Sequence, residues 1–159
     1  MTDSQHAHEE HTTHQGKGAI FGHPIHPILV AFPIAFVTGA LAVDLAFALT
    51  ADAFWARLGL WIVGAALILG ASAALFGILD FYTVPLAREH RAGWIHFIGN
   101  AVVLILTLAN FLLRWNSAEA AVLPWGLTLS AASAILLGIT GWYGGELVYK
   151  HKIGVARHD

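Results

Sequence analysis

The stretch LGLWIVGAALILGASAALFGIL, residues 58–79, is a long apolar segment with no charged residue, and it decides what kind of protein this is. A helix needs about 20 predominantly apolar residues to cross the hydrocarbon core of a bilayer. Three further apolar stretches of similar length lie at residues 28–49, 94–113 and 122–143. The sequence therefore predicts four transmembrane helices.

The composition supports the same class. The chain has 159 residues, of which 57% are hydrophobic and 11% are charged. A soluble domain carries about 25% charged residues, so these charges are too few to cover a surface that faces water. The formal net charge of −2 gives no basic field for a nucleic acid, and the expected partner is the lipid bilayer. Because there is no cysteine, disulfides, iron–sulfur clusters and covalently attached haem are excluded.

The expected architecture is all-α. The linkers between the apolar stretches are short, so consecutive helices are expected to be antiparallel neighbours in an up-down bundle. Residues 19–159 would form this transmembrane domain. Residues 1–18, MTDSQHAHEEHTTHQGKG, have little to bury and are expected to form a disordered tail. This tail is either a solvated segment or, because it is rich in histidine, a weak site for Zn, Cu or Ni ions.

The basic residues predict the orientation of the bundle. The side that bears the N-terminus, called side A, is expected to hold Lys17, Arg88, Arg91, Lys150, Lys152 and Arg157. The opposite side, side B, would hold Arg57 and Arg114. Cytoplasmic segments carry an excess of Lys and Arg, so both termini are predicted to be cytoplasmic.

Two histidines stand directly before prolines in FGHPIHP, residues 21–27. A residue that precedes proline favours an extended or polyproline conformation. In that geometry His23 and His26 would lie about 9 Å apart, as two separate groups rather than one chelate. The alternative interpretation is that this motif is a stiff beginning of the first helix.

His26 and His96 are the strongest candidates for a cofactor site. Each begins a helix that runs from side A to side B, and the first and third helices of an up-down bundle are diagonal. Two imidazoles facing across the core suit the iron of a b-type haem or a transition-metal ion. The candidate cofactor-binding residues are His26, His96 and Asn100, which lies one turn from His96. The candidate metal ligands are His23, His26, Asp80, His96, Glu146 and His151. A hydrogen-bonded cluster without a cofactor is the alternative.

The same motifs resemble a known family. GHPIHP before the first helix, Asp80, His96-x-x-x-Asn100, GWYGGELVY, His151 and the following Gly154-Val155 are similar to the bacterial membrane proteins grouped as domain of unknown function 2231. The resemblance covers residues 20–155. It implies four transmembrane helices in a bacterial membrane, here the inner membrane, and it implies no established activity.

Two principal functions follow from these observations. The first is a membrane redox or metal-handling protein that binds haem b or a transition metal and works with a membrane or redox partner. The second is a non-catalytic membrane subunit or assembly partner whose polar residues are structural. A proton or ion pathway through Asp44, Asn100, Thr107 and Asn110 is a third interpretation. The sequence shows no catalytic motif that would make the chain an enzyme on its own.

Overall fold

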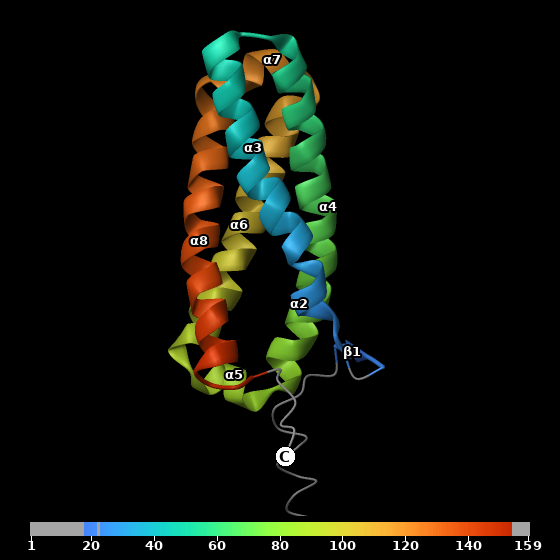
Figure 1. The fold of residues 1–159 in the computed structure, drawn as a ribbon, viewed down its shortest axis with the longest axis vertical. Coiled ribbons are helices and arrows are strands. Elements are labelled where there is room, and N and C mark those ends of the chain that lie inside the picture. The colour runs from blue at the N-terminus through green and yellow to red at the C-terminus, as the bar shows by residue number, and fades with distance from the viewer. Residues whose placement is uncertain (1–17, 22, 154–159) are drawn as a thin grey trace, which may run out of the picture.

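A computed structural model describes residues 18–21 and 23–153, and its helices form one long bundle (Figure 1). The first span consists of α2 (Ile25–Leu29) and α3 (Ala31–Thr50), and the second is α4 (Ala53–Thr83). The third is α6 (Arg91–Trp115), and the fourth consists of α7 (Ala118–Ala121), the π-helical turn η1 (Val122–Gly126) and α8 (Leu127–Tyr149). All four spans are long and apolar enough to cross a membrane. The predicted all-α architecture of four transmembrane helices is confirmed.

The spans follow one another around the bundle. Helix α3 packs against α4, α4 against α6, and α6 against α8, while α8 closes the ring against α3. Consecutive spans are antiparallel because their connections are short. Ala51 ends α3 in the left-handed conformation, with φ 53°, and the Asp52 carboxylate caps α4 by accepting the Phe54 N–H at 2.8 Å. The first and third spans consequently lie on a diagonal of the bundle.

The first span begins differently from the prediction. Strands β1 (Ala19–Ile20) and β2 (His23–Pro24) form a small antiparallel hairpin, and Pro24 then becomes the N-cap of α2. His23 and Pro24 are extended as predicted, whereas His26 lies inside the first turn of α2, so the predicted polyproline conformation is wrong for residues 25–26. The helix tolerates Pro27 because the N–H groups of a first turn have no intrahelical acceptor. The rest of the predicted tail, residues 1–17, lies outside the described residues.

A buried ion pair joins the first and third spans near side B. Asp44 and Arg114 are both 0% exposed, and the guanidinium donates two hydrogen bonds to the carboxylate, at 2.8 and 2.6 Å. Arg114 Nε also donates to Asn110 Oδ1 at 2.8 Å, and Ser130 Oγ donates to Asp44 Oδ2 at 2.6 Å. The Asn110 amide donates to Ser130 Oγ at 2.9 Å and closes the network. The sequence predicts Arg114 among the basic residues of side B, and the structure places it at that end of the third span but buries it in the core.

Two glycines make room for the buried guanidinium. A Cβ atom on Gly59 of α4 would lie 2.7 Å from Arg114 Nη1, and one on Gly126 of η1 would lie 2.6 Å from Nη2. Gly126 is brought there by a break in the fourth span, where Leu123 is non-helical (φ −112°, ψ 133°) and Pro124 follows. The ion pair is thus enclosed by all four spans.

The buried pair provides a test of the fold. Asp44→Asn leaves a charged guanidinium without its counter-ion, and we expect it to lower the free energy of unfolding by about 3–5 kcal/mol. Glu119→Gln is the matched control, since Glu119 lies 3.9 Å from Arg57 and both side chains are well exposed. We expect that control to cost less than about 1 kcal/mol. Thermal unfolding of the purified variants in detergent measures both effects, and equal losses would contradict the burial of Asp44.

A histidine site between two repeated hairpins

His26 and His96 meet inside the bundle. Their ring centroids are 6.3 Å apart and the ring planes are nearly perpendicular, at 87°. His26 comes from α2 and His96 from α6, the two diagonal spans, and both rings are partly buried near the side A end. Of the four residues predicted to converge on one cavity at side A (His26, Asp80, His96 and Glu146), the structure brings the two histidines together.

Each ring is fixed through one nitrogen. His26 Nδ1 lies 2.8 Å from the carbonyl oxygen of Ala73 on α4, and His96 Nδ1 lies 2.9 Å from that of Thr140 on α8. A carbonyl can only accept, so Nδ1 carries the proton in both residues. In the neutral imidazole the lone pair is then on Nε2, which is the atom available to a ligand.

Each ring also rests on a glycine of the neighbouring helix. A Cβ atom on Gly77 would lie 2.8 Å from His26 Cε1, and a Cβ atom on Gly144 would lie 2.7 Å from His96 Cε1. Both glycines lie four residues after the carbonyl that holds the ring. Any larger residue at either position would have to displace the imidazole.

These matched contacts reveal an internal repeat. Positions in the first span recur 70 residues later in the third, so that His26 corresponds to His96 and Asp44 to Arg114. Positions in the second span recur 67 residues later in the fourth. The corresponding pairs there are Gly59 with Gly126, Ala73 with Thr140, and Gly77 with Gly144. The bundle is thus two similar helical hairpins arranged around a pseudo-two-fold axis. The two histidines meet near one end of this axis, and Asp44 and Arg114 meet near the other.

Asn100 supports the His96 half of the site. Its amide donates to the carbonyl of His96 at 2.7 Å, and its Oδ1 accepts from the Thr140 hydroxyl at 3.4 Å. Asn100 therefore links the backbone of His96 to the residue whose carbonyl holds the His96 ring. The corresponding position in the first hairpin is Val30, so this support exists on one side only.

The other candidate metal ligands lie in different places. His23 is on the exposed hairpin, where Nδ1 donates to the Phe21 carbonyl at 3.0 Å. The Asp80 carboxylate accepts the Gly18 N–H at 3.0 Å and anchors the chain before β1. Glu146 accepts from Lys150 at 2.8 Å and lies 3.9 Å from His151 Nε2. Within residues 18–21 and 23–153, no three histidine or acidic side chains form a group that could hold a metal ion.

A second histidine pair lies at the side A rim. His90, which caps the start of α6, stacks on His151 with 3.7 Å between ring centroids and 26° between planes. The sequence grouped His151 with His26 and His96, whereas the structure pairs it with His90. The internal repeat is visible in the sequence but was not predicted. Its signal is a shared spacing: 18 residues separate His26 from Asp44, and 18 residues separate His96 from Arg114.

The fold and these motifs define the class of this chain: a membrane protein built as a four-helix bundle with paired histidines. The sequence profile of the family described as "Predicted membrane protein (DUF2231)" matches residues 22–157, and the chain belongs to this family. Searches of curated proteins and of solved structures gave no significant match.

The contact between Gly144 and the His96 ring provides a second test. Gly144→Ala places a methyl group against the His96 ring and should lower the melting temperature, since buried clashes typically cost about 1–3 kcal/mol. Gly141→Ala is the matched control on the same helix, because a Cβ there meets nothing within 4 Å. We expect Gly141→Ala to be neutral or slightly stabilising, as Ala is the better helix former. Equal melting temperatures for the two variants would show that the His96 ring does not rest on Gly144.

Proposed function

We propose that this membrane protein holds a transition-metal centre between His26 and His96 and serves in redox chemistry or metal handling. The centre is either the iron of haem b or a single metal ion, since both need imidazole nitrogens as ligands. The observation that carries the proposal is the pair of imidazoles, each fixed through Nδ1 and each with Nε2 available.

The spacing of the rings suits a shared metal. Metal–nitrogen bonds are about 2.0–2.1 Å long, and the imidazole centroid lies about 1 Å beyond the nitrogen, so two imidazoles on opposite sides of one metal have centroids roughly 6–6.5 Å apart. The observed separation is 6.3 Å. His26 and His96 would be the two residues that hold such a metal.

The surroundings of each ring also suit a ligand. Histidines that bind metals almost always donate their other N–H to a carbonyl, a carboxylate or water, which fixes the tautomer and the ring orientation. Both His26 and His96 have such a carbonyl. Because the two hairpins repeat this arrangement, a metal on the pseudo-two-fold axis would have two nearly equivalent ligands.

An apolar layer weighs against the ion-pathway interpretation. Between Asn100 and Thr107 the third span presents Val103, which is 6% exposed. At the same level Gly70 of α4 packs against Leu104 and Pro33, to which its Cβ would lie at 3.2 and 3.7 Å. This layer separates the histidine end of the bundle from the polar network around Asp44. The site then communicates with side A, where a membrane or redox partner would reach it.

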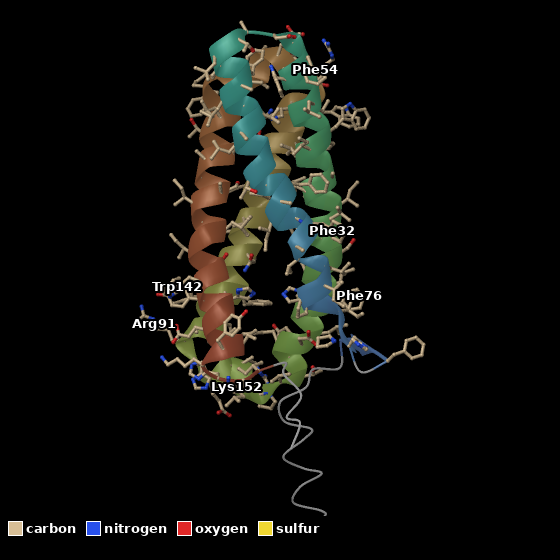
Figure 2. All side chains as sticks on the ribbon, in the orientation of Figure 1. Phe32, Phe54, Phe76, Arg91, Trp142 and Lys152 are labelled. Atoms are coloured by element: carbon tan, nitrogen blue, oxygen red, sulfur yellow. The ribbon has the colours of Figure 1, made fainter. Side chains whose placement is uncertain are left out.

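We infer that side A faces the cytoplasm of a bacterial cell and that the bilayer is its inner membrane. Arg114 forms a buried ion pair with Asp44, so we do not count it among the exposed basic residues of side B. Among the described residues, the other basic side chain on side B is Arg57, and it lies 3.9 Å from Glu119. Arg88, Arg91, Lys150 and Lys152 all lie on side A and are exposed, and Figure 2 marks Arg91 and Lys152 at that end. This imbalance supports cytoplasmic termini.

The histidines carry the decisive test of the metal site. We expect His26→Ala and His96→Ala each to abolish binding, because each removes one of two ligands. Asn100→Ala should cause a partial loss of roughly 10–100-fold in affinity, as loss of a supporting hydrogen bond does. Haem absorbance and elemental analysis of purified protein, expressed with both haem and metals supplied, measure these changes.

Two controls accompany these variants. His23→Ala should bind normally, because His23 lies on the exposed hairpin and its Nδ1 is bonded to Phe21. Deletion of residues 1–16 should also leave binding unchanged, since ligands carried by packed helices do not depend on that segment. A Soret band identifies haem, and metal without a Soret band identifies a bound ion. If wild-type protein carries neither, the alternative of a non-catalytic subunit with a structural polar cluster replaces the metal site.

The orientation is tested separately. Reporter fusions at the N-terminus and the C-terminus should give cytoplasmic signals, and an insertion near Asn116 should give the opposite signal, because four spans return the chain to its starting side. An external signal from the C-terminal fusion would place the histidine site on the outer side of the membrane.

A further inference from the structure

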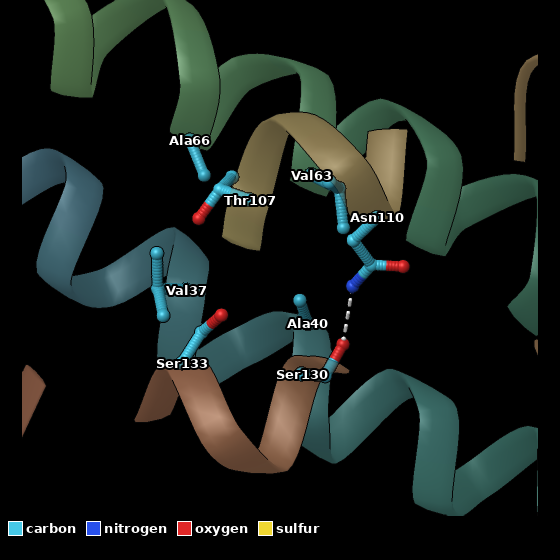
Figure 3. A pocket seen from close by; sticks show the side chains of 8 residues that line it. All are labelled: Val37, Ala40, Val63, Ala66, Thr107, Asn110, Ser130 and Ser133. Carbon is cyan, nitrogen blue, oxygen red and sulfur yellow. Dashed lines mark hydrogen bonds between the residues drawn. The ribbon is translucent and has the colours of Figure 1, made fainter. Parts of the chain in front are cut away.

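A small cavity of about 10 Å³ lies inside the bundle (Figure 3). All four spans contribute to its wall. The lining residues are Val37, Ala40, Val63, Ala66, Thr107, Asn110, Ser130 and Ser133. A cavity of this size is close to the smallest that accepts a single water molecule.

The eight lining residues form four pairs, and the two members of each pair occupy corresponding positions of the two hairpins but differ in polarity. Val37 corresponds to Thr107, Ala40 to Asn110, Val63 to Ser130, and Ala66 to Ser133. In every pair the first hairpin supplies the apolar residue and the second hairpin supplies the polar one. The cavity therefore lies on the pseudo-two-fold axis, with one apolar wall and one polar wall.

The polar wall contains an unsatisfied group. Ser133 is 3% exposed, and its hydroxyl is buried with no hydrogen-bond partner among the described residues. A buried hydroxyl that forms no hydrogen bond is costly, and native proteins satisfy most such groups with protein or with internal water. In Figure 3 Ser133 borders the same space as Thr107, so a molecule in the cavity would be within reach of both.

The other polar side chains of the lining already donate their protons to protein atoms, so they can offer a ligand mainly oxygen lone pairs. The Thr107 hydroxyl donates to Val103 O at 2.8 Å, and Ser130 donates to Asp44. Both amide protons of Asn110 are directed at Ser130 Oγ and the Gly126 carbonyl. Ser133 is thus the lining side chain whose hydroxyl proton remains free. A ligand for this cavity must donate hydrogen bonds to oxygen atoms and accept one from Ser133.

We propose that this cavity is a binding site for one water molecule, which satisfies Ser133 and donates to Thr107 on the polar wall. A cation does not fit the site, because the Arg114 guanidinium lies next to it, bonded to Asn110 and Asp44, and both Asp44 oxygens already accept hydrogen bonds from Arg114. An apolar gas molecule would leave the Ser133 hydroxyl unsatisfied. Water provides two donors and two acceptors within the available volume.

The sign of one stability change tests the proposal. If water is bound, Ser133→Ala removes a hydrogen bond and should lower the melting temperature by about 2–4 °C. If the cavity is dry, the same substitution removes an unsatisfied hydroxyl and should raise the melting temperature. Ser130→Ala is the matched control on the same helix, and it should lower the melting temperature in either case because Ser130 bridges Asn110 and Asp44.

A filling variant gives a second, independent measurement. Val37→Ile adds one methyl group to the apolar wall and should displace the water. With Ser133 present, this should lower the melting temperature, whereas in the Ser133→Ala background it should raise it, because no unsatisfied hydroxyl then faces the cavity. Stabilisation by Val37→Ile in both backgrounds would overturn the proposal. So would an experimental structure that resolves internal water elsewhere and shows this cavity empty.

Discussion

The constraint on which this structure depends is that the core of a bilayer offers no water to a charged or polar group. Asp44 and Arg114 meet that constraint as a pair. The guanidinium is held by the carboxylate and by Asn110, and the carboxylate is also bonded by Ser130. Three spans supply these side chains, and the glycines beside the guanidinium include Gly59 from the remaining span. Neither charge can be buried before the helices are in register, so the pair links burial to correct assembly.

The internal repeat explains why the two polar sites lie where they do. In a bundle of two similar hairpins, corresponding residues of the first and third spans face each other across the axis. The histidines are one such pair, and Asp44 with Arg114 is another. Eighteen residues of helix separate the two sites, which is about 27 Å and comparable to the hydrocarbon thickness of about 30 Å. The two ends of one axis therefore lie near opposite faces of the membrane.

The two hairpins are alike in shape and unlike in chemistry. The second hairpin supplies Thr107, Asn110, Ser130 and Ser133 where the first supplies small or branched apolar residues. Two of these polar residues, Asn110 and Ser130, complete the hydrogen bonds of the Asp44–Arg114 pair. At the histidine end the two halves are more alike, since each ring has a carbonyl at its Nδ1 and a glycine beside it, and they differ in Asn100, which supports His96 alone. The two ends of the bundle thus use the repeat differently: the charged pair is asymmetric, whereas the two histidine rings have matching contacts.

The sequence by itself determined the class of protein, the four spans and the convergence of His26 and His96. Long apolar stretches and short linkers are local features, and in lipid they leave little choice except antiparallel helices. Contacts between distant residues were decided only by the tertiary structure. The pairing of Asp44 with Arg114, of His151 with His90, and of Asp80 with the Gly18 amide depends on which helix faces turn toward each other. The conformation of His26 was also settled there, because the β1–β2 hairpin places Pro24 as the cap and draws His26 into the helix.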